Sequence, residues 1–249
     1  MKQNNHFENL ISRRNSGRKS LAVLVDPDKI SSVEILLSKC KTNPPDLFLV
    51  GSSFKGDESV SFCISKIRSS CNVPIILFPG NMNQVVSDAD AILLLSVISS
   101  RNSELLIGKH VEAALKVKES GLEVIPTGYI LVESGKLTSV HYMSQSMPVP
   151  NDKPELAAAT ALAGQQLGLQ AIYLEAGSGA ENVVPAKMIH AVKSLVNCLL
   201  FAGGGITTPE QLSAAYSAGA DVAVIGNKLE AQPELILQFA AVRDQHYSE

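Results

Sequence analysis

Two glycine-rich stretches near the C-terminal end of the chain are suited to hold an anion. Gly203, Gly204 and Gly205 follow an apolar run that begins at Leu199, and Gly226-Asn227 follow a second apolar run one strand–helix unit later. Without a Cβ, backbone N–H groups can come close to a bound anion. The loops after strands seven and eight of a (β/α)8 barrel grip phosphate in this way. A phosphorylated ligand is therefore the first functional inference, and closure of tight turns is the alternative.

A carboxylate and a hydroxyl end two other apolar runs. Asp26 follows residues 21–25, and Ser53 follows residues 47–50 with Ser52 before it. Their oxygens are hard ligands of the kind that Mg2+ prefers. A Mg2+ site with few protein oxygens, completed by water and phosphate, suits an enzyme that uses a diphosphate. Capping of the next helix beside Pro27 is the alternative role for Asp26, and Lys29 is either part of the site or a solvated lysine.

Glu175 ends a further apolar run and is followed by the small residues Ala176-Gly177-Ser178-Gly179. Apolar neighbours predict a raised pKa for this carboxyl, which suits a general base. The alternative is a structural carboxylate that accepts hydrogen bonds from loop amides.

Several common catalytic and metal-binding motifs are missing from the sequence. It contains no GxSxG, HExxH or GxxxxGK[ST] motif, so the common hydrolase, zinc-protease and P-loop interpretations have no support. His110 and His190 fall in predicted helices, away from strand ends. The four cysteines are scattered without a CxxC pair, which indicates reduced thiols rather than a metal site.

Composition and charge narrow the classes of protein further. The chain has 249 residues, of which 45% are hydrophobic and 18% charged, so it can bury a large core. A net charge of −3 argues against a nucleic-acid binder. The N-terminus is basic, but the apolar run at 21–25 is too short for a signal peptide, and no run reaches the length of a membrane span. We expect a cytoplasmic protein.

Alternating strands and helices predict a single (β/α)8 TIM barrel over residues 1–249, with residues 1–20 as an N-terminal extension. Strands are expected at 21–25, 47–50, 75–78, 91–95, 123–125 and 171–174 and in the runs that begin at Leu199 and Asp221. Residues 82–90 are too few for a full helix, so the barrel should be irregular after strand three. Between strands five and six, residues 130–132 and 137–142 alternate around Ser134-Gly135, which predicts an extra strand or hairpin.

Five motifs of this sequence, in the order in which they occur, resemble those of the geranylgeranylglyceryl phosphate synthase family, most closely those of its second group. The resemblance runs from Leu21 to about Asn227, and the run at 173–179 is its most specific element. The motifs are Leu-Val-Asp-Pro-Asp-Lys at 24–29, Val-Gly-Ser-Ser at 50–53, Pro-Thr-Gly-Tyr-Ile at 126–130, Tyr-Leu-Glu-Ala-Gly-Ser-Gly-Ala at 173–180 and Gly-Gly-Gly-Ile at 203–206.

This resemblance implies a reaction and a set of roles. Enzymes of the family join an isoprenoid diphosphate, here most simply geranylgeranyl diphosphate, to the 3-hydroxyl of sn-glycerol 1-phosphate, with Mg2+ as cofactor and diphosphate as leaving group. The metal positions correspond to Asp26 and Ser53, although Ser52 replaces a glycine found in many members. Glu175 corresponds to the base, with Tyr173 as a second catalytic residue. The glycerol phosphate site corresponds to Tyr173, Leu174, Glu175, Ala176, Gly177, Ser178, Gly179, Gly204, Gly205, Gly226 and Asn227.

Other expectations concern the prenyl tail, partners and rival functions. The irregular region after strand three, with residues 93–98, is expected to line the prenyl groove. We expect a homo-oligomer (a dimer or hexamer), no nucleic-acid partner, and transient contact with a membrane surface when product leaves. Two rivals are another phosphosugar-converting TIM barrel and a non-catalytic barrel that binds a prenyl phosphate.

Overall fold

The apolar runs of the sequence form parallel strands in the computed structural model, which describes residues 5–51 and 57–246. Within those residues the strands form one closed barrel in chain order, and β8 pairs back to β1. This confirms the predicted (β/α)8 barrel. The strands are β1 (Ser20–Val25), β2 (Leu47–Val50), β3 (Ile75–Leu77), β4 (Ala91–Ser96), β5 (Glu123–Leu131), β6 (Ala171–Glu175), β7 (Leu199–Gly203) and β8 (Val222–Ile225).

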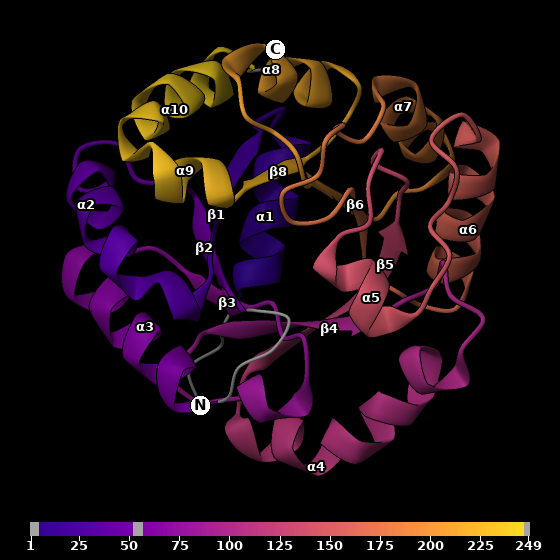
Figure 1. The fold of residues 1–249 in the computed structure, drawn as a ribbon, viewed down its shortest axis with the longest axis horizontal. Coiled ribbons are helices and arrows are strands. Elements are labelled where there is room, and N and C mark those ends of the chain that lie inside the picture. The colour runs from indigo at the N-terminus through magenta and orange to yellow at the C-terminus, as the bar shows by residue number, and fades with distance from the viewer. Residues whose placement is uncertain (1–4, 52–56, 247–249) are drawn as a thin grey trace.

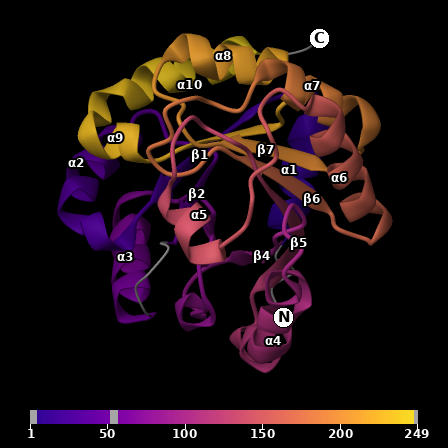
Figure 2. The same cartoon turned by 45° about the vertical axis from the view of Figure 1, so that its right-hand side comes forward.

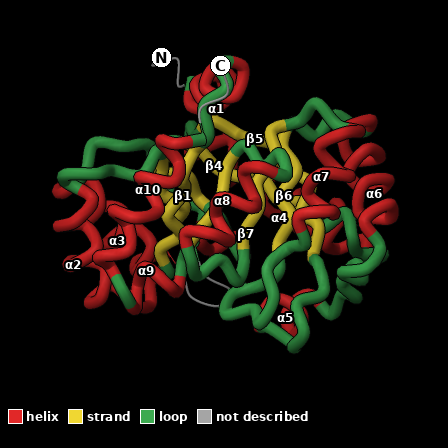
Figure 3. The backbone as a smooth tube through the Cα atoms, turned by 90° about the horizontal axis from the view of Figure 1, so that it is seen from above, coloured by secondary structure: helices red, strands yellow, loops and turns green. Residues whose placement is uncertain are grey.

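Helices surround the strands as a ring (Figure 1). The ring contains α2 (Ile30–Cys40), α3 (Asp57–Ser70), α4 (Lys109–Ser120), α6 (Pro154–Gln166), α7 (Ala186–Leu195), α8 (Pro209–Ser217), α9 (Asn227–Ala231) and α10 (Ile236–Gln245). Two further helices, α1 (His6–Asn15) and α5 (Ser139–Ser144), lie over the ends of the barrel (Figure 3). Shorter helical segments are η1 (Pro27–Lys29), η2 (Met82–Gln84), η3 (Glu104–Gly108) and η4 (Pro233–Leu235). None of the described helices is long and apolar enough to cross a membrane.

The connection between β3 and β4 is irregular, as predicted. Only the single turn η2 lies between these strands in the described chain, so the ring has no full helix between α3 and α4 (Figure 1). The turn is fixed locally, because the Asn81 side chain accepts a hydrogen bond from the Asn83 amide at 2.9 Å.

The predicted hairpin between strands five and six is wrong. The first of its segments extends β5 to Leu131 and ends in an isolated parallel bridge between Val132 and Val149. The second segment forms the helix α5, whose first turn is stabilised where the Thr138 amide donates to His141 Nδ1 at 3.2 Å. The alternating sequence misled because the side chains that this segment buries, Thr138, His141 and Ser144, are polar and recur every three residues, as on one face of a helix.

The barrel interior is packed with large apolar side chains, and burying each contributes about 1.5–3 kcal/mol. Helix α1 closes the amino end of the barrel, where Leu10 packs against this interior cluster. The Glu123 carboxylate accepts hydrogen bonds from the His6 and Phe7 amides at 2.8 and 3.0 Å, which fixes the start of α1. The expected N-terminal extension is therefore partly a plug. Figure 3 shows α1 and α5 at opposite ends of the barrel.

Candidate active site

Glu175 is the last residue of β6, and only 5% of its surface is exposed at the carboxyl end of the barrel. Its Oε1 accepts a hydrogen bond from the Gly177 amide at 2.6 Å. Burial raises the pKa of Glu175 to about 7, against the opposing effects of the Gly177 amide and the Tyr173 hydroxyl. The predicted raised pKa is thus confirmed. A carboxyl of this kind exchanges a proton near neutral pH, which is what a general base requires.

Tyr173 lies two residues before Glu175 and so faces the same side of β6, the barrel interior. Its ring stacks on Phe78 and Phe201, with centroids 5.1 and 5.7 Å away. Its buried hydroxyl approaches Glu175 closely enough to lower the pKa of that carboxyl, yet it makes no regular hydrogen bond with any described residue. Burial raises the pKa of Tyr173 itself far above its ordinary value, so the phenol stays protonated. It is suited to donate to an oxygen of a bound molecule.

Two neighbouring loops surround Glu175 with glycines in left-handed conformations. The φ angles of Gly177, Gly179, Gly204 and Gly205 are 99°, 68°, 82° and 75°. A Cβ on Gly204 would collide with Glu175 Oε1 and with the amides of the loop after β6. Close approach, and not turn closure alone, therefore requires glycine here. Backbones of this shape direct N–H groups toward an anion.

The loop after β8 joins the same site. Asn227 is the first residue of α9, and its Nδ2 donates to Ser178 Oγ at 2.9 Å. Gly226 precedes it at the end of β8. The structure thus brings together the predicted residues of three loops, those after β6, β7 and β8.

Two residues of the predicted substrate set point elsewhere. The side chains of Leu174 and Ala176 belong to the apolar layer between the barrel and α6 and α7. The Ala176 amide is already bonded to the Gly203 carbonyl at 3.0 Å. These two residues shape the loop but present no side chain to the barrel mouth.

Lys29 links the glycine loops to the end of β1. Its Nζ donates to Asn227 Oδ1 at 3.1 Å and to Glu230 Oε2 at 2.8 Å. The buried Glu230 also accepts a hydrogen bond from the Asp26 amide at 3.2 Å. Lys29 is therefore not a merely solvated lysine. Figure 2 shows α9, which carries Asn227 and Glu230, beside α2 on one flank of the barrel.

The predicted metal position is only partly described. Asp26 lies half-buried at the end of β1, whereas Ser53 and its neighbour Ser52 lie outside the described residues. No cluster of three or more His, Cys, Asp or Glu side chains that could hold a metal occurs in the described chain. The donor set at Asp26 still fits Mg2+, which is commonly bound by one or two carboxylates together with water and phosphate oxygens.

An apolar rim of five side chains also packs on the interior of the barrel. Leu24, Phe78, Leu95, Val97 and Val140 are partly buried side chains packed on the interior cluster that includes Tyr173. Leu95 and Val97 belong to the segment for which the sequence predicts the prenyl groove. This rim suits the apolar part of a ligand whose polar part lies at the glycine loops.

Other residues of the segment that was expected to line the prenyl groove lie away from the rim. Leu93 is completely buried inside the barrel. Ile98 packs toward Gly128 and Gly164, where added side chains would strike its Cδ1. Only part of residues 93–98 therefore reaches the rim.

Sequence reasoning missed Glu230. The sequence did contain a signal that Glu230 belongs to the site. It lies one turn into the short helix after strand eight, and that segment borders the barrel mouth.

The family model described as the PcrB family matches residues 15–243. The chain belongs to the PcrB family. Among PcrB-like relatives, the geranylgeranylglyceryl phosphate synthase of Spirosoma linguale is 52% identical over 229 residues, covering 91% of this chain and 92% of that one. The synthase of Chitinophaga pinensis is 43% identical over 239 residues, covering 95% of each chain.

A solved structure agrees with the PcrB assignment. The crystal structure of (S)-3-O-geranylgeranylglyceryl phosphate synthase from Thermoplasma acidophilum, in complex with sn-glycerol-1-phosphate, superposes with a TM-score of 0.87 at 27% identity. The match covers 96% of this chain and 98% of that chain.

The contact between Gly204 and Glu175 generates a first prediction. Gly204→Ala should weaken binding of sn-glycerol 1-phosphate by about tenfold or more, because the methyl group displaces the Glu175 carboxyl and the loop amides. Gly121→Ala is the matched control, since Gly121 has a φ of 69° and open space around its Cβ position. Both changes cost about 1–2 kcal/mol of backbone strain. Calorimetric titration of the two folded variants checks this, and equal affinities would contradict it.

The Lys29 contacts generate a second prediction. Lys29→Met should raise the KM for sn-glycerol 1-phosphate about tenfold, because the buried Glu230 loses its cation and Asn227 loses a donor. Lys66→Met is the control, since the Lys66–Glu34 pair at 3.1 Å is exposed on the outer helices. Exposed pairs contribute only about 0–1 kcal/mol. Steady-state kinetics decide the matter, and a KM that stays at the parent's value in Lys29→Met would refute the role.

Proposed function

We propose that the protein transfers a prenyl group, most simply geranylgeranyl, from its diphosphate to the 3-hydroxyl of sn-glycerol 1-phosphate. The observation that carries this proposal is Glu175, a buried carboxyl with a pKa of about 7 between two loops of left-handed glycines. The synthase names of the two relatives and the glycerol phosphate complex of the Thermoplasma acidophilum enzyme support the same substrate class.

The glycine loops and the Asn227–Ser178 pair bind the phosphate and thereby orient the glycerol. Glu175 accepts the proton of the 3-hydroxyl as its oxygen attacks C1 of the prenyl chain. The C1–O bond to diphosphate breaks, and its electron pair leaves with the diphosphate. The buried Tyr173 hydroxyl donates to an oxygen at the reacting centre and stabilises charge there.

The two ends of the prenyl diphosphate meet different parts of the mouth. The apolar rim formed by Leu24, Phe78, Leu95, Val97 and Val140 covers the tail. Asp26, together with Ser53, would hold Mg2+. When bound, Mg2+ neutralises negative charge on the leaving diphosphate.

We also propose that the protein forms a homo-oligomer in the cytoplasm. A stripe of exposed apolar side chains along η3 and α4, formed by Ile107, Val111 and Leu115, supports self-association. Their spacing places them on one helical face.

Glu175→Gln tests the reaction most directly. Glutamine keeps the size of the side chain but cannot accept the proton, so we expect kcat to fall by about two to four orders of magnitude while both substrates still bind. Diphosphate release is measured with Mg2+, sn-glycerol 1-phosphate and prenyl diphosphates of several lengths, and the product is identified by mass spectrometry. A parent enzyme that binds prenyl diphosphate without releasing diphosphate would favour the non-catalytic carrier.

The pH profile provides a separate prediction for Glu175. Only the ionised carboxylate accepts a proton, so the rate of the parent should fall as pH decreases through about 7. The low-pH limb should disappear in Glu175→Gln, where the remaining slow rate no longer titrates there. If the rate of the parent does not change between about pH 6 and 8, which is about one unit either side of this pKa, Glu175 is not the base.

Asp26→Asn tests the metal position. The neutral amide binds Mg2+ poorly, so turnover should be nearly abolished and Mg2+-dependent binding of prenyl diphosphate should weaken. Binding of sn-glycerol 1-phosphate should persist, which separates loss of metal from loss of fold. Unchanged Mg2+ dependence in this variant would refute the assignment.

A further inference from the structure

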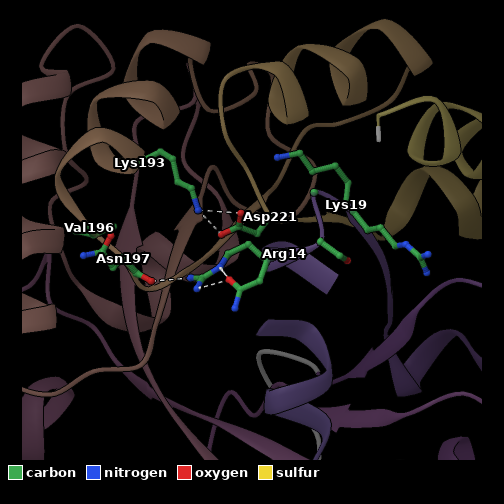
Figure 4. Close-up of a pocket in the computed structure, with 10 residues that line it drawn as sticks. Arg14, Lys19, Lys193, Val196, Asn197 and Asp221 are labelled. Carbon is green, nitrogen blue, oxygen red and sulfur yellow. Dashed lines mark hydrogen bonds and ion pairs between the residues drawn. The ribbon is translucent and has the colours of Figure 1, made fainter. Parts of the chain in front are cut away.

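A second concave site lies at the amino end of the barrel, opposite the candidate active site. It is a hollow of about 740 Å3 between the segment that leads into β1 and the turn between α7 and β7. Figure 4 shows Arg14 and Lys19 on one side of it and Lys193, Val196 and Asn197 on the other, with Asp221 between them. The volume is in the range of small-molecule sites.

Cations dominate this hollow although the whole chain carries a net charge of −3. Asp221, the one carboxylate that the described residues contribute to its lining, is already engaged. Asp221 pairs with Lys193 at 2.7 Å and accepts the Leu200 amide at 2.9 Å. Asp221 and Lys193 therefore form a structural ion pair, in which Lys193 already balances the charge of Asp221.

Arg14 is held in place without a carboxylate. Its Nη1 donates to the Asn197 carbonyl at 2.6 Å, while Nε and Nη2 donate to Asn15 Oδ1 at 3.2 and 3.0 Å. These contacts use three of the five N–H donors of the guanidinium. The neighbouring Arg13, by contrast, pairs with Asp46 at 2.7 Å. Arg14 thus offers an oriented cation with free donors beside the hollow.

Lys19 is the second cation with no ion pair among the described residues. Burial lowers the pKa of Lys19, and the nearby Lys193 lowers it further, against the attraction of Asp221. Its ammonium group is therefore held partly desolvated without full compensation. A bound anion would supply the missing negative charge.

We propose that this hollow, the basal pocket, binds a small anion that carries two or more phosphate groups. The phosphates contact Arg14 and Lys19, and the volume exceeds what a single phosphate ion fills. The inference does not depend on the reaction at the other end of the barrel. The basal pocket nevertheless adjoins the starts of β1, β7 and β8, the strands whose opposite ends carry Asp26 and the glycine loops.

Inorganic tripolyphosphate is the probe, titrated into the full-length protein without Mg2+ or phosphate buffer. Backbone amide signals in the NMR spectrum locate the binding, since Gly17 and Asn197 report the basal pocket and Gly177 and Gly204 report the other end. We expect saturable shifts at Gly17 and Asn197. In Arg14→Gln/Lys19→Gln the affinity should fall at least about tenfold, which corresponds to the loss of charge-assisted contacts.

Two control variants separate a site from general electrostatics. Arg101→Gln/Lys118→Gln removes the same charge from exposed positions on another part of the surface and should bind as the parent does. Arg14→Lys/Lys19→Arg keeps both charges and should retain most of the affinity. Equal weakening in the two Gln double variants, or no shifts at Gly17 and Asn197, would overturn the proposal.

The phosphate groups could belong to a free compound or to a lipid headgroup. Co-sedimentation with cardiolipin vesicles, whose headgroup carries two phosphates, distinguishes the two sources. Tripolyphosphate binding without vesicle binding supports a free phosphate compound. Vesicle binding that requires Arg14 and Lys19 supports a headgroup as the source.

Discussion

The burial of one carboxyl group constrains the whole carboxyl end of this barrel. Glu175 is removed from solvent on a central strand, and one loop amide stabilises its charged form. The two adjacent loops have to pass close to it, which they do only because Gly203 and Gly204 lack side chains. A Cβ on Gly203 would collide with the Tyr173 hydroxyl, as one on Gly204 would with Glu175. The same loops hold Gly177, Gly204 and Gly205 in left-handed conformations around the carboxyl.

Polar and apolar groups come from different strand ends at the mouth of the barrel. Loops after β6, β7 and β8 supply backbone donors, and the end of β1 supplies Asp26 and Lys29. The β3 and β4 side supplies apolar side chains, and it lacks a full covering helix in the described chain. A molecule with a charged end and a long apolar end matches this division. The hydrogen bonds from Ser178 through Asn227 and Lys29 to Glu230 hold the polar half as one unit.

Strands and the glycine loops that follow them were predictable because each is encoded locally. Buried parallel strands are continuous apolar runs, and glycines mark their ends, so the barrel and the position of its glycine loops followed from the sequence. The helix α5 did not follow, because Val140 and Tyr142 fit a strand or a single helical turn equally well. Glu230 and the basal pocket depend on contacts between residues far apart in the chain. No local pattern encodes such contacts, and the paired Lys29 looked like any exposed lysine.

The plug formed by α1 has a consequence for how the chain reaches this state. The amides at the start of α1 are bonded to Glu123, which lies 117 and 116 residues further along the chain. Ser20 at the start of β1 pairs with Val222, and its carbonyl accepts the Tyr216 hydroxyl at 2.9 Å. β1 thus pairs with β2 close by in the chain, whereas the pairing that closes the barrel joins it to β8, about two hundred residues away. Contacts of such long sequence separation slow folding, so we expect closure between β1 and β8 to be the slow step.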